Sequence, residues 1–246
     1  MGEWMPDGAW QAYCGAPPVP GGTGWNLDPW LGLALGVGIA LAWRRSDNRR
    51  ALMAGWLVLA LALVSPLCNL SVALFSARVG QHLTILLVAA PLLAIGLATP
   101  RRPPRAGRIA AAAACFAALL WLWHLPGPYV ATFRSDLTYW AMHLSLLVAG
   151  IWLWRGLLLA AVDRPEAVLP AGIATAAQMS ALGAFLTFAP RAIFPPHAYT
   201  TLAWGLTPLE DQQLGGLIMW VPGGLAFAGV AVGSLIMAMR RGQFAA

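Results

Sequence analysis

The apolar stretch LGGLIMWVPGGLAFAGVAVGSLIMAM, residues 214–239, is the strongest indication of the fold class of this 246-residue chain. It contains no Asp, Glu, Lys or Arg, and a helix crosses the hydrocarbon core of a bilayer with about 20 such residues. We therefore expect a membrane-spanning helix from Pro208 to Met239. Because this segment is longer than a bilayer requires, we expect it to project into the outer aqueous phase, to kink near Pro222, or both. Its glycines, Gly215 and Gly216 among them, would let neighbouring helices approach closely.

The composition of the whole chain is also typical of a membrane protein. It is 59% hydrophobic and only 10% charged, with a mean hydropathy of +0.69, whereas a soluble domain carries about 25% charged residues. The sequence predicts an all-α polytopic membrane bundle of about seven transmembrane helices. Six expected segments precede the last one, and they are Pro29–Trp43, Ala51–Val64, Ser71–Leu97 with Pro91 inside it, Arg108–Trp123, Leu137–Leu159 and Pro170–Phe188.

Arginine placement predicts the orientation. All fifteen basic residues are arginines, and alternating the loops between two sides puts twelve of them on one side. Because basic loops stay in the cytoplasm, the N-terminus is expected outside and the C-terminus inside, in a bacterial inner membrane. The outer side keeps Arg78, Arg134 and Arg191, and the twelve inner arginines are residues 44, 45, 49, 50, 101, 102, 105, 108, 155, 164, 240 and 241.

The same distribution sets the expected domain organisation and partners. We expect an extracytoplasmic N-terminal segment at 1–27, a membrane domain at 28–241 and a cytoplasmic tail at 242–246. The first residues lack a basic region followed by an apolar core, so we expect no cleavable signal peptide. The net charge of +6 comes from short clusters between apolar runs. Such clusters are topology signals that favour membrane lipid and exclude nucleic acid as a partner.

Histidines form the first group of candidate functional residues. All four, His82, His124, His143 and His197, fall on or near the expected outer face. His82 and His143 are each followed by apolar sequence, and an ionisable residue that enters the membrane usually faces the bundle interior and has a function. A neutral imidazole can bind copper, zinc, iron or haem, and sulfur ligands nearby would favour copper(I). The alternative is an interfacial histidine that hydrogen-bonds backbone or water.

Other polar and sulfur-containing residues complete the candidate metal set. Asp211 and Met219 are eight residues apart, so they lie near one face of the last helix, about 12 Å apart along it. Asp211 also suits the helix N-terminus without any ligand. Cys14 and Cys68 are expected either to form a disulfide or to offer thiolates to copper. The candidate metal ligands are therefore His82, His143, His124, Met219 and Asp211.

Three motifs resemble a known family. The segment DQQLGGLIMWVPG, residues 211–223, resembles the last-helix signature of the multi-spanning CtaG family of cytochrome c oxidase assembly proteins. The WHLP element at residues 123–126 resembles another family motif. A third is formed by Gln81-His82 with LLVAAPLL at residues 86–93. The similarity covers most of the membrane region.

The resemblance implies a function. It implies a non-enzymatic inner-membrane factor for assembling a haem-copper oxidase, which handles copper at the periplasmic face. Its expected partners are cytochrome c oxidase subunits or another respiratory complex. The family typically has a second histidine one turn before each of the two main ones, where this chain has Arg78 and Tyr139.

Two alternatives remain open at this point. The first is a metal-free accessory or structural subunit that stays attached to a respiratory complex, which the replacements at Arg78 and Tyr139 favour. The second is a haem-binding electron carrier with His82 and His143 as axial ligands, since both share a membrane depth.

Overall fold

The computed structural model describes residues 12–97 and 103–240. The expected N-terminal segment is described only from residue 12, and Arg101, Arg102, Arg241 and the tail at 242–246 lie outside the described residues. The described residues form helices, with a single isolated bridge between Ser46 and Leu97 and no strand. The all-α prediction is confirmed.

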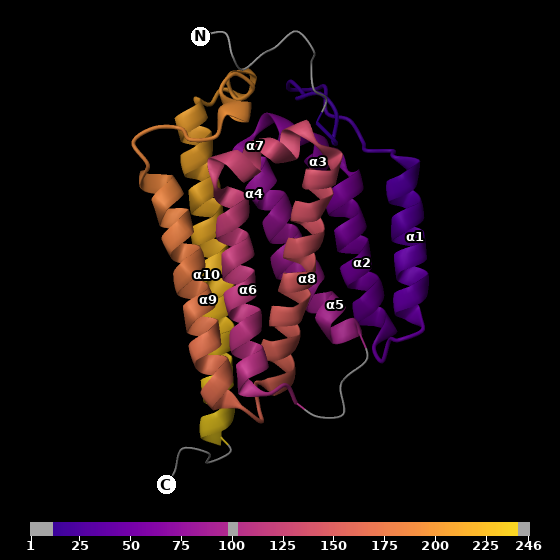
Figure 1. Cartoon of the computed structure of the whole chain (residues 1–246), viewed down its shortest axis with the longest axis vertical. Coiled ribbons are helices and arrows are strands. Elements are labelled where there is room, and N and C mark those ends of the chain that lie inside the picture. The colour runs from indigo at the N-terminus through magenta and orange to yellow at the C-terminus, as the bar shows by residue number, and fades with distance from the viewer. Residues whose placement is uncertain (1–11, 98–102, 241–246) are drawn as a thin grey trace.

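The long helices lie side by side and alternate in direction, as Figure 1 shows. Short helices and loops cover the end of the bundle where α10 begins, and α10 ends at the opposite end. The long elements are α1 (Pro29–Trp43), α2 (Arg49–Val64), α4 (Phe75–Leu83) continuing through the π-helical turn η1 (Thr84–Ala89) into α5 (Ala90–Gly96), α6 (Ala106–His124), α8 (Asp136–Ala160), α9 (Pro165–Phe188) and α10 (Pro208–Arg240). The short ones are α3 (Pro66–Ala73), α7 (Pro126–Arg134) and the 3-10 turns η2 (Pro195–His197) and η3 (Leu202–Trp204).

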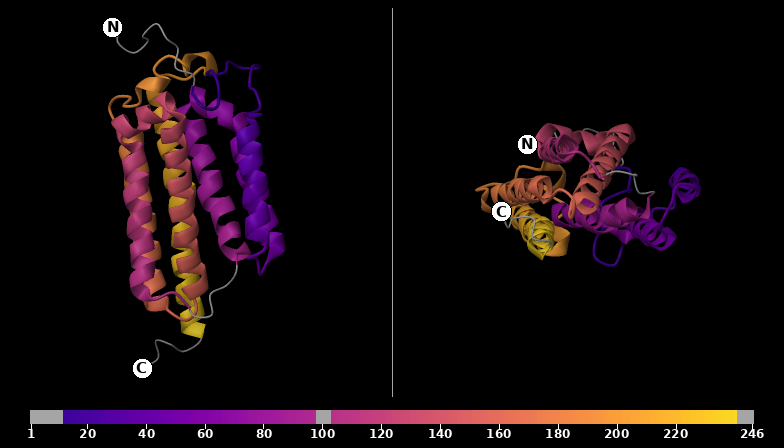
Figure 2. Two further views of the ribbon diagram at one scale, coloured as in Figure 1. Left: turned by 45° about the vertical axis from the view of Figure 1, so that its right-hand side comes forward. Right: turned by 90° about the horizontal axis from the view of Figure 1, so that it is seen from below.

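Helix length and composition identify several candidate membrane spans in the part of the chain that the structure describes, fewer than the seven expected. Within the described residues, five helices are long and apolar enough to cross a bilayer, or six if the bent pair α2–α3 forms one span. They are Phe75–Gly96, α6, α8, α9 and α10. With 15 residues, α1 is an apolar helix below that length. It lies at the edge of the bundle beside α2 (Figure 2).

The region around residues 64–75 differs from the prediction. We expected one helix from Ser71 to Leu97, but a new helix starts at Phe75 because Leu74 has an extended backbone (φ −124°, ψ 129°). Upstream, Pro66 breaks the chain, and Ser65 caps the new helix α3 by accepting a hydrogen bond from the Leu67 amide at 3.3 Å. Proline is favoured at a first helical position, where its missing N–H would have no partner anyway. Helices α2 and α3 therefore meet at an angle of 48°.

Glycines set the close packing of α9 against α10, as the sequence indicated. A Cβ atom added to Gly183 of α9 would lie 2.8 Å from the Gly216 carbonyl oxygen of α10. One added to Gly215 would overlap the ring of Phe75. Small residues let helix backbones approach closely in membranes, so these positions fix how α10 lies against both α9 and α4.

A proline leaves one carbonyl of the π-helical turn in the third long helix without a backbone donor. In η1, the Ile85 carbonyl accepts a hydrogen bond from the amide five residues on, at Ala90. The same spacing would pair the Leu86 carbonyl with Pro91, which has no N–H. The indole of Trp154 in α8 donates to this carbonyl instead, with an Nε1–O distance of 2.7 Å. A side chain of α8 therefore satisfies the backbone group that Pro91 leaves open.

This interaction predicts the effect of Trp154→Phe. The substitution keeps an aromatic ring but leaves the buried Leu86 carbonyl without a donor, which costs about 1–3 kcal/mol. We expect a lower unfolding temperature of the purified protein in detergent. The control is Trp152→Phe, because Trp152 on the same helix is 41% exposed and its replacement should leave the unfolding temperature nearly unchanged. Equal effects of the two substitutions would contradict this account.

Candidate functional site

His82 and His143 lie against each other inside the bundle. His82 is in the last turn of α4 and His143 in α8, and their ring centroids are 5.0 Å apart in an edge-on arrangement. The two residues are only 8% and 5% exposed. The Nε2 atom of each ring is buried and has no hydrogen-bond partner. Buried polar atoms rarely lack partners, so this pair has the character of an incomplete binding site.

The hydrogen bond of His143 determines which ring nitrogen can act as a ligand. Its Nδ1 lies 3.1 Å from the Tyr139 carbonyl oxygen, one turn earlier in α8. A carbonyl only accepts, so Nδ1 carries the proton and donates. In a neutral imidazole the lone pair then resides on Nε2. The unpartnered atom of His143 is therefore the one able to bind a metal ion.

Arg78 lies one helical turn before His82 and is 3% exposed. Its Nη2 donates to the Thr132 hydroxyl at 2.6 Å and lies 3.8 Å from the Met142 sulfur. Its Nε has no partner, and the described residues contain no carboxylate in an ion pair with it. The site therefore contains a buried cation without a neutralising carboxylate.

Aromatic rings surround this guanidinium. Its central carbon lies 4.4 Å from the ring centroid of Phe133, 5.0 Å from Tyr129 and 5.9 Å from Tyr139. The negative faces of such rings attract a cation, the more so when it is desolvated. Two of the three rings belong to α7, a helix that is absent from the expected set because Pro126 follows the end of the preceding expected helix so closely. The sequence feature that indicates α7 is Pro126 itself, because proline is favoured at the first position of a helix.

Tyr139 connects the histidine pair to a disulfide. Its ring centroid lies 4.1 Å from that of His143, and its hydroxyl lies 3.3 Å from the sulfur of Cys14. Cys14 is bonded to Cys68, with their Cα atoms 5.5 Å apart. Of the two sequence alternatives for these cysteines, the structure has the disulfide. In this state neither sulfur is a thiolate available to a metal ion.

The N-terminal segment covers this part of the bundle. Tyr13 stacks on Tyr139 with ring centroids 4.8 Å apart, and its hydroxyl donates to the Asp28 carboxylate at the start of α1. Burial and the neighbouring carboxylate raise the pKa of Tyr13. The hydrogen bond from Tyr13 in turn lowers the pKa of Asp28. Near neutral pH the pair is therefore a phenol donating to a carboxylate, which attaches the segment to α1.

His124 is not brought into contact with the pair. Its Nδ1 donates to the Leu120 carbonyl at 2.7 Å, so its geometry repeats that of His143. Its ring meets the edge of Phe75, with centroids 6.4 Å apart. Phe75 precedes His82 by seven residues, about 10 Å along a helix. His124 therefore lies near the start of α4, whereas His82 lies near its end.

Met219 is a buried core residue at an intermediate depth. It is 2% exposed and belongs to the main hydrophobic core. Gly215, one turn earlier in α10, faces Phe75, and Gly223, one turn later, faces Met179 and lies near Leu83. Met219 is thus level with the middle of α4, between its two ends.

Asp211 caps α4. Its carboxylate accepts hydrogen bonds from the Phe75 amide at 2.6 Å, from the Ser76 amide at 3.1 Å and from the Ser76 hydroxyl. The first amides of a helix have no partner within it, so this carboxylate from α10 satisfies two of them. Asp211 lies at the opposite end of α4 from His82, and the two expected ligands are not adjacent.

His197 has a structural arrangement of its own. Its Nδ1 lies 3.3 Å from the Ala73 carbonyl oxygen and donates to it, and its Nε2 accepts from the Tyr129 hydroxyl at 2.6 Å. Burial lowers the pKa of His197 to about 3, so the ring is neutral at physiological pH. Both nitrogens are occupied, and the residue connects the loop between α9 and α10 to α3 and α7.

The available donor set is small. Across residues 12–97 and 103–240, no group of three or more His, Cys, Asp or Glu side chains could hold a metal ion. The two imidazoles of His82 and His143 are the described donors that lie together. Zinc sites need three or four protein ligands, and calcium needs six or more oxygens, so this pair suits neither ion.

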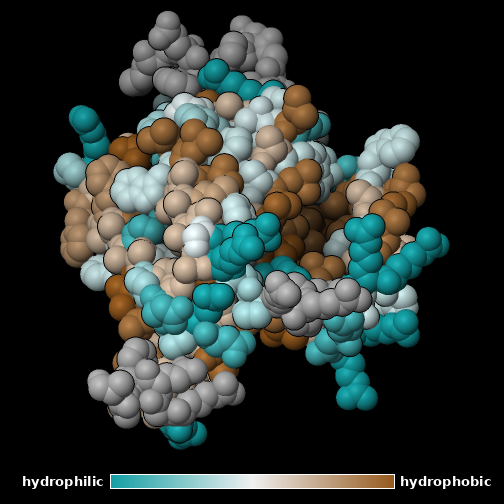
Figure 3. Space-filling view, turned by 60° about the horizontal axis from the view of Figure 1, so that its bottom comes forward, coloured by the Kyte–Doolittle hydropathy of each residue, from teal (hydrophilic) through white to brown (hydrophobic). Residues whose placement is uncertain are grey.

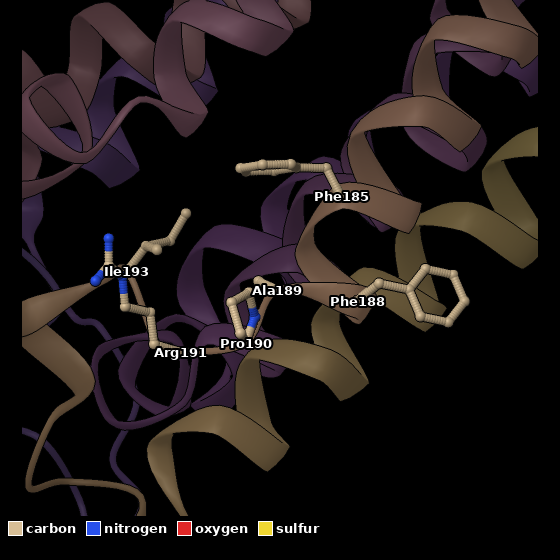
Figure 4. A pocket seen from close by; sticks show the side chains of 6 residues that line it. All are labelled: Phe185, Phe188, Ala189, Pro190, Arg191 and Ile193. Atoms are coloured by element: carbon tan, nitrogen blue, oxygen red, sulfur yellow. The ribbon is translucent and has the colours of Figure 1, made fainter.

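Two further cavities are lined mainly by apolar residues, and one of them reaches the site. One of about 140 Å³ lies between α1, α2, η1 and α8, and His143 is its single titratable lining residue. A larger one of about 560 Å³ lies at the end of α9 (Figure 4). There Phe185 points toward Ile193 and Arg191 of the following loop, and the ring of Phe188 points away from them. No histidine lines this second cavity.

The capping contacts predict the effect of Asp211→Ala. Two buried amides of α4 would lose a charged acceptor, which we expect to lower the free energy of unfolding by at least about 2 kcal/mol. Unfolding of the purified protein in detergent measures this. Glu210→Ala is the matched control, because Glu210 is exposed and bonds only to Thr207. Loss of metal binding by Asp211→Ala at an unchanged unfolding temperature would contradict the capping role.

Comparison with known protein families gives a match over most of the chain. The family model described as "Cytochrome c oxidase caa3 assembly factor (Caa3_CtaG)" matches residues 34–241. No curated protein and no solved structure matches the chain.

Proposed function

Because the chain belongs to the cytochrome c oxidase caa3 assembly factor family, we propose that it helps to assemble such an oxidase by binding copper(I) between His82 and His143. The proposed role is non-catalytic, and the copper ion is cargo. The observation that carries the proposal is the pair of buried, unpartnered Nε2 atoms on rings 5.0 Å apart.

Ligand chemistry favours copper(I) over other metals. Imidazole binds copper as well as zinc, and copper(I) accepts fewer ligands than zinc, so two nitrogen donors can hold it. A site with two imidazoles and no nearby carboxylate or free thiolate suits this ion better than zinc, calcium or magnesium. The lone pair of His143 is already directed to Nε2 by the hydrogen bond to the Tyr139 carbonyl.

Arg78 lowers the affinity of the proposed site for a metal ion, which favours release of the ion. Its buried positive charge repels a metal ion one helical turn away, and the repulsion is strong where water is excluded. Copper(I) carries a smaller charge than the divalent transition-metal ions and is repelled less. A site of this kind holds its cargo weakly, as a delivery protein requires.

The proposed location is the outer face of a bacterial inner membrane, with seven spans and the N-terminus outside. Arginine placement supports this orientation: Arg44 and Arg45 lie in the turn between α1 and α2, Arg49 and Arg50 begin α2, and α10 ends at Arg240. These ends lie opposite the disulfide-bearing end. Disulfides persist in oxidising compartments such as the periplasm, which supports the same assignment.

A metal-free accessory role is the second candidate. Arg78 is held by Thr132 and three aromatic rings, and this arrangement favours a structural use of the cation. In that role the protein would remain bound to oxidase subunits and would need no copper.

The copper proposal predicts that the purified protein binds one copper(I) per chain. Anaerobic titration against a chromophoric copper(I) chelator measures the affinity. His82→Ala and His143→Ala should each weaken binding at least about tenfold, because each removes one of two ligands. His197→Gln is the control, since both nitrogens of His197 already have partners.

The substitution Arg78→His tests the same site by an expected gain in copper affinity. It removes the repelling charge and adds an imidazole one turn before His82, so binding should become tighter than in the wild type. Wild-type protein that binds no copper, yet co-purifies with oxidase subunits at fixed stoichiometry, would overturn the copper proposal in favour of the accessory role.

The orientation predicts the behaviour of terminal reporters. Alkaline phosphatase, which is active only outside the inner membrane, should be inactive when fused after Arg240, and a fluorescent protein that folds in the cytoplasm should be bright there. A bright cytoplasmic reporter at the N-terminus would contradict the proposed arrangement.

A further inference from the structure

A group of arginines lies far from the histidine pair, at the end of the bundle where α10 terminates. A cavity of about 450 Å³ opens there between the start of α6 and the last turns of α8. Figure 3, which brings this end forward, shows hydrophilic side chains between apolar surfaces. Three arginines and no carboxylate line the cavity. Its lining residues are Pro103, Pro104, Arg105, Arg108, Trp152, Arg155, Gly156 and Leu159.

The helices fix the shape of this cavity. A Cβ atom added to Gly156 of α8 would lie 3.6 Å from Ile109 of α6, in ordinary contact. The two helices therefore meet below the cavity and form its floor. Arg155 is half-buried and donates from Nη1 to the Ala94 carbonyl at 3.1 Å, which attaches it to α5. The cavity is thus built on three helices.

Charge at the cavity mouth is unbalanced. Arg105 and Arg108 are exposed, lie at the start of α6 about one turn apart, and make no ion pair with any described residue. Planar guanidinium groups bind phosphate oxygens in pairs of parallel hydrogen bonds. Three of them around one cavity without a carboxylate suit a ligand with a phosphate group.

An apolar stripe continues from the cavity along α8. Trp152, Val148 and Leu144 are 41%, 63% and 53% exposed and follow one another at four-residue spacing. They share one helix face over about 12 Å. Tryptophan is enriched where a bilayer meets water. A ligand with a phosphate at the arginines would therefore have an apolar surface beside it for an acyl chain.

We propose that this cavity binds the headgroup of an anionic phospholipid, with the phosphate at Arg105, Arg108 and Arg155 and an acyl chain along the exposed face of α8. Basic cavities between transmembrane helices are suited to such headgroups. The apolar stripe selects the lipid over free phosphate, because inorganic phosphate would use only the arginines. This inference is independent of copper binding.

Native mass spectrometry of the full chain, purified in mild detergent and supplied with cardiolipin or phosphatidylcholine, tests the proposal. The wild type should retain cardiolipin at least about tenfold more than phosphatidylcholine. The double variant Arg105→Gln/Arg108→Gln should lose this preference. Both side chains are exposed, so its unfolding temperature without added lipid should match that of the wild type.

The control variant removes the same charge at the other end of the bundle. Arg134→Gln/Arg191→Gln should keep the wild-type preference for cardiolipin. An equal loss in both double variants would mean a general effect of net charge and would overturn the proposal. Displacement of cardiolipin by millimolar inorganic phosphate at constant ionic strength would also overturn it, since the acyl chain would then contribute nothing.

Discussion

The carboxylate of Asp211 positions the element on which the proposed site depends. It accepts hydrogen bonds from the first two amides of α4 and so attaches this helix to α10. Unpaired backbone groups are costly where water is absent, so an acceptor at this point determines where α4 can begin. Arg78 and His82 lie on the same helix, one and two turns further on. Their depth and direction follow from that attachment.

The other end of this helix is fixed by the same requirement. Pro91 leaves the Leu86 carbonyl without its backbone donor, and Trp154 of α8 supplies one. His143 also belongs to α8, so the contact that satisfies the π-helical turn also sets α8 against α4. π-helical turns occur often at functional sites, and here the turn directly follows His82 in the chain. The two rings thus meet because two backbone requirements are met by neighbouring helices.

The sequence predicted the architecture better than the site. Apolar length and proline positions placed most long helices within a few residues, and the family resemblance is confirmed. The proximity of His82 to His143 was predicted only as a shared depth, because contact between two helices depends on how they rotate. The aromatic surroundings of Arg78 could not be foreseen, since Tyr129 and Phe133 belong to a short helix with no membrane-spanning pattern. The capping of α4 by Asp211 was missed for a related reason: its acceptor and donors are more than 130 residues apart.

The disulfide between Cys14 and Cys68 has a consequence for α1. This helix packs mainly on α2 and exposes Trp30, Leu33 and Leu41 to its surroundings. The covalent bond joins residues 54 positions apart and encloses both helices in one closed loop. If α1 separated from α2 in the plane of the bilayer, the loop would keep its effective concentration near its partner high. A peripheral helix with few contacts can thus be retained by a tether instead of by packing.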